Sequence, residues 1–482
     1  MMLLSQAAQA LGGKLIGKDV LFSAVSSDSR TLTAGDLFVA LQGKNFDGAA
    51  FVEGAARSGA VAALMNAENY GGAPLPCPVL LVDDTRLALG RLAAHWRTQF
   101  SIPLVAVTGS NGKTTVKEML ASILRVEAGG ANAVLATAGN LNNDIGMPLT
   151  LLKLRAFHRY AVIEMGMNHP GEIEYLTLLA RPDVAVINNA GSAHLEGLGS
   201  VEAVARAKGE IFLGLSPQGY AVINADDLYA PMWRELAGKR PIIEFGLERH
   251  VAVHAKWQAK GYGSHIVVGT PEGEFAAQMQ VPGVHNVRNA LAATAAALAV
   301  RVSLPAIAAG LEKYSGTAGR MQRRDAMHGA VLIDDSYNAN PASLRVALKV
   351  LMQGTGRKIL VLGDMGELGN EAERMHAEVG AEAHHLGVDE LLAIGELSRH
   401  AVNAFGQYAR HYDRIEDLLA ALDKKLDAKT TVLVKGSRFM RMERVVQHCT
   451  DGAGNGPTRE KSPGVAGGEG EGAAGMCLSP VL

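Results

Sequence analysis

The chain has 482 residues, of which 48% are hydrophobic and 20% charged, and its formal net charge is −2. This length exceeds one ordinary hydrophobic core and predicts about three domains. The composition is that of a soluble globular protein, and the small net charge argues against a general nucleic-acid-binding protein. Three widely spaced cysteines, Cys77, Cys449 and Cys477, form neither a disulfide framework nor a zinc site.

The N-terminus has no basic region and no long apolar core, so we do not expect a signal peptide. The most apolar stretch, Ala290 to Val300, is too short to span a bilayer and predicts a buried helix. We therefore expect a cytoplasmic monomer without membrane insertion.

The order of apolar runs and turns predicts an α/β protein of three domains. Residues 1–85 form a small α/β unit, residues 86–317 a middle domain and residues 318–450 a Rossmann-like domain, while the glycine-rich segment 451–482 lacks periodicity and predicts disorder. In the middle domain, strands alternate with helices, which favours a mostly parallel sheet. In the first domain, strands are expected at 37–41 and 78–82, and a helix leading into a strand at 55–65. The later expected strands are 104–108, 160–164, 183–188, 219–223 and 241–245, then 330–334, 358–362, 391–394 and 431–434; long helices are expected at 86–100 and 286–300.

A glycine-containing loop joins the strand at 104–108 to a helix. It comprises Gly109, Ser110, Asn111, Gly112, Lys113, Thr114 and Thr115. Glycines let backbone N–H groups turn toward an anion, and the start of the helix adds its positive dipole end. Lys113 can then reach the outer phosphates of a nucleotide, and the Thr114 hydroxyl can bind Mg²⁺. This pattern predicts a protein that uses ATP or GTP.

The loop departs from the common phosphate-loop form at one position. Five residues before Gly112 stands Val107 where that form has a glycine. The alternative is a chance Gly-Lys-Thr turn before a helix, but the strand and the helix on either side favour the phosphate loop.

Three further side chains are candidates for the chemistry of the middle domain. Glu164 ends a predicted strand, where a carboxylate can bind Mg²⁺ beside nucleotide phosphates; the alternative is a solvated carboxylate. His194 follows another strand, although most loop histidines are structural or lie at the surface. By its spacing alone, Lys208 is an ordinary solvated lysine on a helix.

Taken together, these motifs resemble those of the Mur ligase family, from about Ser26 to Val446. The resemblance rests on the loop at 108–115 and on Thr137–Gly146, Glu164–His169, His194–Glu196, Ala207–Ile211 and Gly283–Ala290. It implies a three-domain ligase that uses ATP and two Mg²⁺ ions to form an amide bond. By this resemblance Lys208 carries CO₂ as a carbamate, and Glu164, His194 and the Lys208 carbamate bind one metal ion while Thr114 serves the other.

The resemblance also implies positions for the substrates. His285, Asn286 and Asn289 lie beside adenine, Asp335 contacts the ribose, and Arg320, preceded by Gly319, meets the phosphates. The residues expected to hold the other substrates are Ser27, Asp28, Ser29, Arg30, Asn45, Phe46, Asp47 and Gly48 in the first domain, Asn140, Asn142 and Asn143 in the middle domain, and Tyr337, Asn338 and Asn340 in the third. The family often has proline before this Gly-Arg pair, where this chain has Ala318.

Within the family, the motifs are most similar to the branch that joins D-alanyl-D-alanine to a UDP-N-acetylmuramoyl-tripeptide for peptidoglycan synthesis. The branch that adds a diamino acid carries an Asp-Asn-Pro-Arg motif, which this sequence lacks. A folylpolyglutamate synthase would share the phosphate loop but lack the first domain that holds a UDP substrate. A regulatory nucleotide-binding module is a further alternative, against which the set of Glu164, His194 and Lys208 argues.

Overall fold

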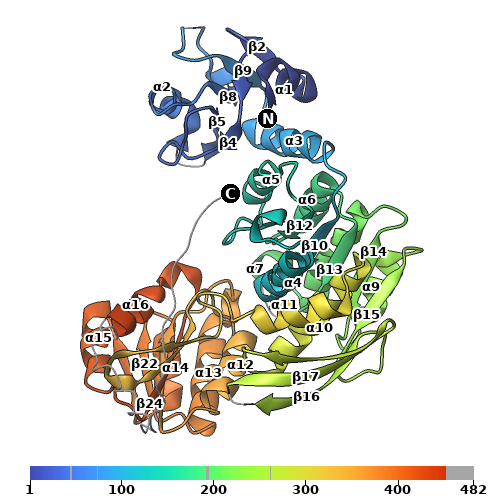
Figure 1. The fold of residues 1–482 in the computed structure, drawn as a ribbon. Coiled ribbons are helices and arrows are strands. Elements are labelled where there is room, and N and C mark those ends of the chain that lie inside the picture. The colour runs from blue at the N-terminus through green and yellow to red at the C-terminus, as the bar shows by residue number, and fades with distance from the viewer. Residues whose placement is uncertain (44–45, 73, 192–194, 261, 452–482) are drawn as a thin grey trace, which may run out of the picture.

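The computed structural model describes residues 1–43, 46–72, 74–191, 195–260 and 262–451. Asn45, His194 and the segment 452–482, all of which carry predictions from the sequence, lie outside these ranges. The chain folds into three α/β domains, which Figure 1 shows in blue, in green to yellow and in orange to red.

The first domain is built on a five-stranded sheet of order β2-β9-β8-β5-β4, in which only β2 is antiparallel to its neighbour. The predicted strands at its centre are confirmed, because β5, β8 and β9 are buried along their whole length. The elements are β1 (Met2–Leu3), α1 (Leu4–Leu11), β2 (Lys14–Ile16), β3 (Leu21–Phe22), β4 (Ala24–Ser26), β5 (Asp36–Val39), β6 (Gln42–Gly43), β7 (Phe46–Asp47), η1 (Gly48–Phe51), α2 (Val52–Arg57), β8 (Ala62–Asn66), η2 (Ala67–Asn69) and β9 (Val79–Val82).

Helix α3 (Thr85–Arg97) connects the first domain to the second. The Asp84 carboxylate caps it by accepting hydrogen bonds from the backbone N–H groups of Arg86 and Leu87, at 2.7 and 2.9 Å. Its apolar face, which includes Leu89 and Leu92, belongs to a core that continues from α1 into the middle domain. The first domain is therefore fixed to its neighbour by packing as well as by the chain.

The middle domain contains a six-stranded parallel sheet of order β11-β12-β10-β13-β14-β15. The five predicted strands are confirmed to within about a residue, and β11 was missed. The elements are β10 (Leu104–Thr108), α4 (Lys113–Glu127), η3 (Ala131–Ala133), β11 (Val134–Ala136), α5 (Gly146–Leu151), β12 (Tyr160–Glu164), α6 (Glu172–Ala180), β13 (Val184–Ile187), α7 (Leu195–Leu198), α8 (Val201–Gly209), η4 (Glu210–Gly214), β14 (Tyr220–Asn224), α9 (Ala230–Ala237), β15 (Ile242–Phe245), α10 (Val284–Ala299) and α11 (Leu304–Lys313).

The sequence did not reveal a three-stranded antiparallel sheet inserted before α10. Its strands are β16 (His254–Lys260), β17 (Gly263–Thr270) and β18 (Gly273–Met279). In the sequence of β16, only Ala255, Trp257 and Ala259 alternate with polar residues, and the strand is largely exposed, so its apolar signal is weak. Only β17 alternates clearly, with Ile266 and Val268 buried against α10 and its neighbours.

The third domain has a six-stranded sheet of order β19-β20-β24-β21-β22-β23, in which β19 is the antiparallel edge strand. The four predicted strands are confirmed. The elements are β19 (Gln322–Asp325), η5 (Met327–Gly329), β20 (Val331–Asp335), α12 (Pro341–Leu351), β21 (Arg357–Gly363), η6 (Gly369–Glu371), α13 (Ala372–His385), β22 (Glu390–Ile394), α14 (Ser398–Phe405), β23 (Ala409–Tyr412), α15 (Ile415–Asp423), β24 (Thr430–Lys435), η7 (Arg438–Met440) and α16 (Glu443–Asp451).

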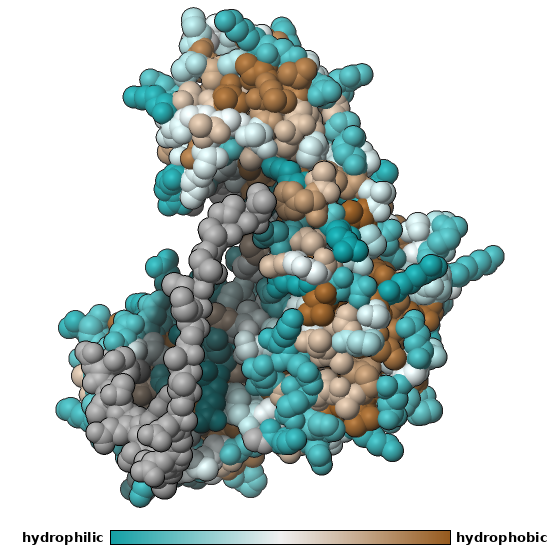
Figure 2. Space-filling model, viewed as in Figure 1, coloured by the Kyte–Doolittle hydropathy of each residue, from teal (hydrophilic) through white to brown (hydrophobic). Residues whose placement is uncertain are grey.

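Hydrophilic residues dominate the face shown in Figure 2, where apolar side chains form separate groups. Within the described part of the chain, no helix has the length and apolar character that a membrane crossing requires.

Candidate active site

A cleft of about 1450 Å³ lies between the middle and third domains and extends toward the start of α3. Its lining brings together most of the residues predicted from the sequence. Those residues are Ser110, Asn111, Gly112, Lys113, Thr114, Thr115, Asn140, Asn142, Asn143, Glu164, His285, Asn286, Asn289, Arg320, Asp335, Tyr337, Asn338 and Asn340.

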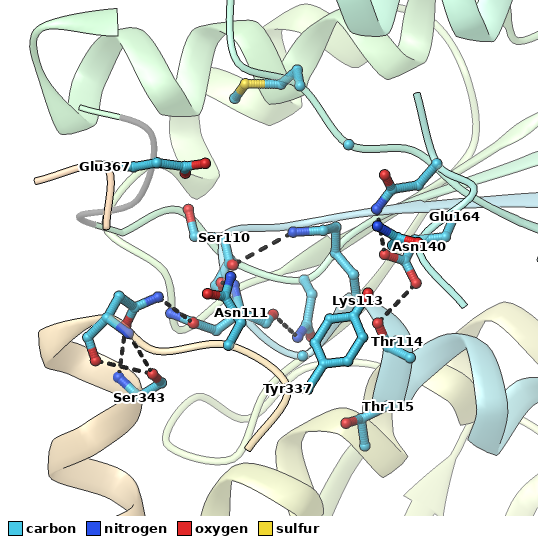
Figure 3. Close-up of a pocket in the computed structure, with 18 of the residues that line it drawn as sticks. Ser110, Asn111, Lys113, Thr114, Thr115, Asn140, Glu164, Tyr337, Ser343 and Glu367 are labelled. Atoms are coloured by element: carbon cyan, nitrogen blue, oxygen red, sulfur yellow. Dashed lines mark hydrogen bonds between the residues drawn. The ribbon is translucent and has the colours of Figure 1, made fainter. Parts of the chain in front are cut away.

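The phosphate-type loop forms the centre of the cleft, between the end of β10 and the start of α4. Gly112 precedes the helix with a φ of 78°, in the left-handed region that favours glycine. A Cβ at this position would lie 2.4 Å from Asn289 Oδ1, so the loop also packs too closely for a side chain. The ammonium of Lys113 donates to the carbonyl oxygen of Gly109 at 2.6 Å and to that of Ser110 at 3.5 Å. Figure 3 shows the contact with Ser110. Partial burial lowers the pKa of Lys113, while the nearby Glu164 carboxylate opposes that shift.

Asparagines from neighbouring strand ends hold this loop in place. The backbone N–H of Asn111 donates to Asn189 Oδ1 at 2.9 Å, and its carbonyl accepts from Asn188 Nδ2 at 2.9 Å. Asn188 is itself held, because Asn224 Nδ2 donates to its carbonyl at 2.9 Å. These supporting residues were not predicted from the sequence. Their signal was available, since Asn188 and Asn224 lie at the carboxyl ends of β13 and β14, where ligands gather in such sheets.

Glu164 is a buried, oriented carboxylate rather than a solvated one, with 2% of its surface exposed. Its Oε2 accepts a hydrogen bond from Thr114 Oγ1 at 2.9 Å, and its Oε1 accepts from Asn142 Nδ2 at 2.8 Å. Its backbone N–H donates to Thr137 Oγ1 at 2.9 Å. The phosphate loop and the Thr137–Asn143 segment therefore meet at one carboxylate (Figure 3).

Lys208 differs from the prediction made from its spacing alone, because it is 1% exposed in α8 and not a solvated surface lysine. Its burial, assisted by the Lys113 charge, holds the pKa of its ammonium well below its ordinary value. Among the described residues, no ion pair or hydrogen bond to its Nζ is found, and it is not one of the cleft-lining residues. His194, predicted to lie near it, is outside the described residues, and no cluster of three His, Cys, Asp or Glu side chains suited to a metal occurs within them.

The third domain contributes positive charge to the opposite wall. The Arg320 guanidinium stacks on the Tyr337 ring at 4.1 Å, and its Nη2 lies 3.5 Å from Thr114 Oγ1. Within the described part of the chain, the buried Nε of Arg320 has no hydrogen-bond partner. Asp335 forms a buried ion pair with Lys435, whose Nζ also donates to the Asn338 carbonyl at 2.9 Å.

The predicted adenine-side residues line the cleft at the start of α10. Asn286 Nδ2 donates to the Pro282 carbonyl at 2.8 Å, while Asn289 accepts from Asn188 Nδ2 at 2.9 Å. Burial, together with the charges of Lys435 and Arg288, lowers the pKa of His285 to about 4. The imidazole is therefore neutral at neutral pH and can both donate and accept a hydrogen bond.

Those predicted first-domain residues whose side chains the structure describes do not line this cleft. Asp28 instead accepts hydrogen bonds from the backbone N–H and the guanidinium of Arg30, and the Asp47 carboxylate caps η1 through the Ala49 N–H at 2.9 Å. Ser27, Ser29 and Gly48 are likewise not among the described residues that line the cleft. At the first-domain end the cleft is lined by Asp84, Arg86 and Leu87.

Comparison with known proteins places this cleft in a family. Residues 107–297 match the Mur ligase middle domain, residues 319–438 the Mur ligase glutamate ligase domain, and residues 21–97 the Mur ligase family catalytic domain. The UDP-N-acetylmuramoyl-tripeptide–D-alanyl-D-alanine ligase of Escherichia coli strain K12 is 43% identical over 452 residues, which cover 92% of this chain and 97% of that protein. The chain belongs to the Mur ligase family.

Solved Mur ligases share the three-domain arrangement. A crystal structure of MurF from Acinetobacter baumannii is 37% identical, with a TM-score of 0.83 over 92% of this chain and 97% of that one. MurF ligase from Thermotoga maritima in complex with ADP is 28% identical, with a TM-score of 0.77 over 90% and 98% of the two chains. The three-domain α/β fold predicted from the sequence is thereby confirmed.

Proposed function

We propose that this protein joins D-alanyl-D-alanine to UDP-N-acetylmuramoyl-tripeptide in an ATP-dependent reaction, as the name of its E. coli relative describes. The observation that carries the proposal is similarity over nearly the full length of both chains, at 43% identity. The cleft supports it because a phosphate loop, a buried carboxylate and a guanidinium nitrogen that has no partner among the described residues meet there.

The proposed reaction has two steps. A carboxylate oxygen of the tripeptide attacks the γ-phosphorus of ATP, the bond from that phosphorus to the bridging oxygen breaks, and an acyl phosphate and ADP form. The amine of D-alanyl-D-alanine then attacks the acyl carbon, loses a proton and expels phosphate. The first step creates a good leaving group, and exclusion of water from the cleft protects the intermediate from hydrolysis.

Side chains around the phosphate loop suit the charge that moves in the first step. Lys113 of the loop and Arg320 of the third domain bring positive charge together, and a phosphate oxygen would give the Arg320 Nε the partner that it lacks among the described residues. Asp335, Asn286 and Asn289, which line the cleft, are assigned to the nucleoside. Tyr337, Asn338 and Asn340 are assigned to the third-domain wall beside the other substrates.

Thr114 would provide an oxygen ligand for one Mg²⁺ ion and Glu164 for a second, and the 2.9 Å contact between them places these two ligands side by side. When bound, the ions would neutralise negative charge on the phosphates. His194 and Lys208, the latter as a carbamate, would complete the ligands of the ion at Glu164. A buried amine with a lowered pKa is the neutral nucleophile that addition of CO₂ requires.

Phosphate release with purified substrates tests the proposal. We expect ATP-dependent release with UDP-N-acetylmuramoyl-tripeptide and D-alanyl-D-alanine, and none with folate and glutamate. Lys113→Ala should abolish release, whereas Lys153→Ala, which removes an exposed lysine outside the cleft, should not. Activity only with folate would establish the alternative ligase, and near-normal turnover by Lys113→Ala would disprove the phosphate-loop assignment.

Lys208 has its own test. Lys208→Ala should inactivate the enzyme, and a small added carboxylate should restore part of the activity by supplying the lost oxygen ligands. Full activity without the added carboxylate would show that the amine has no role in the reaction.

A further inference from the structure

The phosphate loop contacts the third domain through two asparagine side chains. Asn340 Nδ2 donates to Asn111 Oδ1 at 3.0 Å, although 229 residues separate them in sequence. Asn111 belongs to the loop before α4, and Asn340 is the residue immediately before α12. We propose that this contact makes nucleotide binding depend on docking of the third domain, and that Asn340 is a positioning residue for the phosphate loop. The proposal rests on the nucleotide site proposed above.

The orientation of the Asn340 amide is fixed by its own helix. Asn340 Oδ1 accepts the backbone N–H of Ser343 at 2.8 Å, and the Asn340 N–H donates to Ser343 Oγ at 3.1 Å. This reciprocal pair is a capping box, which satisfies N–H groups left free at the helix start. With Oδ1 engaged by the helix, the Nδ2 group is the part of the side chain that faces the loop. The helix α12 and the amide donor therefore move together.

Asn111 is held from the other side by the middle domain. Its carbonyl accepts hydrogen bonds from Asn188 Nδ2 at 2.9 Å and Asn189 Nδ2 at 3.0 Å, and its N–H donates to Asn189 Oδ1. The backbone of Asn111 is thus fixed to β13, while its side chain is fixed to α12 (Figure 3). Because the loop lies between these two attachments, displacement of α12 removes one of the constraints on its conformation.

A contact that favours one loop conformation couples two events. If docking of α12 increases nucleotide affinity, then bound nucleotide must stabilise docking by the same factor. One hydrogen bond of this kind corresponds to a change in affinity of about threefold to tenfold. The third domain would therefore be held in place most firmly when a nucleotide occupies the phosphate loop.

The test uses the full chain and ADP, measured by calorimetric titration without turnover. Asn340→Ser retains a side chain that caps helices as well as asparagine does, but it lacks the Nδ2 donor. Asn111→Ala removes the acceptor and leaves the cap untouched. Asn340→Ser and Asn111→Ala should each weaken ADP binding about threefold to tenfold. The double variant should bind ADP no more weakly than whichever single variant has the lower ADP affinity. Asn340→Ala, which loses both the cap and the contact, shows how much of any effect comes from helix stability.

A second measurement separates positioning from a merely structural role. ADP should slow amide hydrogen exchange at the start of α12 in the wild-type protein and not in Asn340→Ser. Wild-type ADP affinity in Asn340→Ser, or independent effects that multiply in the double variant, would overturn the proposal while leaving the proposed function intact. A wild-type chain that binds no ADP would instead overturn the proposed function itself.

Discussion

Helix α4 has a left-handed glycine beside each end, and the two glycines form a matched pair for mutation. Gly112 precedes the helix with a φ of 78°, and Gly129 follows it with a φ of 72°. A Cβ on Gly112 would lie 2.4 Å from Asn289 Oδ1 and 2.6 Å from Asn188 Nδ2, whereas a Cβ on Gly129 would meet nothing within 4 Å. Substituting alanine therefore imposes the same backbone strain at both sites but a steric clash at only one.

The magnitudes follow from these geometries. A left-handed conformation costs a residue with a Cβ about 1–2 kcal/mol, so Gly129→Ala should lower the free energy of unfolding by that amount. Gly112→Ala should lower the free energy of unfolding by the same amount. It should also disturb the buried 2.9 Å hydrogen bond from Asn188 Nδ2 to Asn289 Oδ1. Leaving such groups unsatisfied costs a further ~1–3 kcal/mol. Urea denaturation should therefore show Gly112→Ala to be less stable than Gly129→Ala by that further amount.

Nucleotide binding provides the functional half of this experiment. Because Asn188 also holds the Asn111 carbonyl, Gly112→Ala should weaken ADP binding, while Gly129→Ala should bind ADP like the wild-type protein. Equal stabilities and equal ADP affinities for the two variants would refute the argument that close packing by the asparagines shapes the loop.

Two further predictions concern buried charge. Because the pKa of His285 is lowered from 6.5 to about 4, its imidazole binds a proton less readily in the folded state than in the unfolded state. The stability that the neutral imidazole contributes is therefore complete above pH 6.5 and is lost as the pH falls toward 4. Between pH 7 and 4.5, denaturation should show the wild-type protein losing about 2 kcal/mol more than His285→Gln, and parallel losses would contradict the assignment. Lys435→Met should cost about 3–5 kcal/mol, because it leaves the Asp335 carboxylate buried and unpaired. Arg399→Met, which breaks an exposed ion pair with Asp413 in the same domain, should cost less than about 1 kcal/mol, and similar losses for both variants would contradict this difference.

The strands of the parallel sheets were predictable because both of their faces are covered. Strands such as β10 and β24 are buried along their whole length, so they appear as continuous apolar runs in the sequence. The strand β16 could not be recognised in this way, since most of its residues face solvent and it has no continuous apolar run. The short strand β11 has only three residues, too few for periodicity to be apparent.

The candidate site was only partly predictable, for a different reason. Lys113 and Thr114 carry a local motif, and their positions follow from the strand, loop and helix on either side. Lys208 has no such local signal, because its burial arises from packing of α8 against elements distant in sequence, including Trp233 of α9, whose Nε1 donates to the Ala205 carbonyl at 2.9 Å. The Asn111 contact with Asn340 likewise depends on the position of one domain against another, which neither local sequence specifies.

Strand order in the middle sheet separates the charged and neutral partners of the phosphate loop. The strand β10 lies between β12 and β13, so residues at the ends of these two neighbours approach the loop from opposite sides. From β12 comes Glu164, which accepts a hydrogen bond from Thr114, and from β13 comes Asn188, which donates to the Asn111 carbonyl. A cation is attracted to a carboxylate and not to an amide donor, so Glu164 on the β12 side suits the Mg²⁺ proposed above better than Asn188 does. On the β13 side, Asn188 is held by Asn224 and joined to α10 through Asn289. The chain passes from one side of β10 to the other between β12 and β13, and this reversal of strand order brings both kinds of partner to one loop.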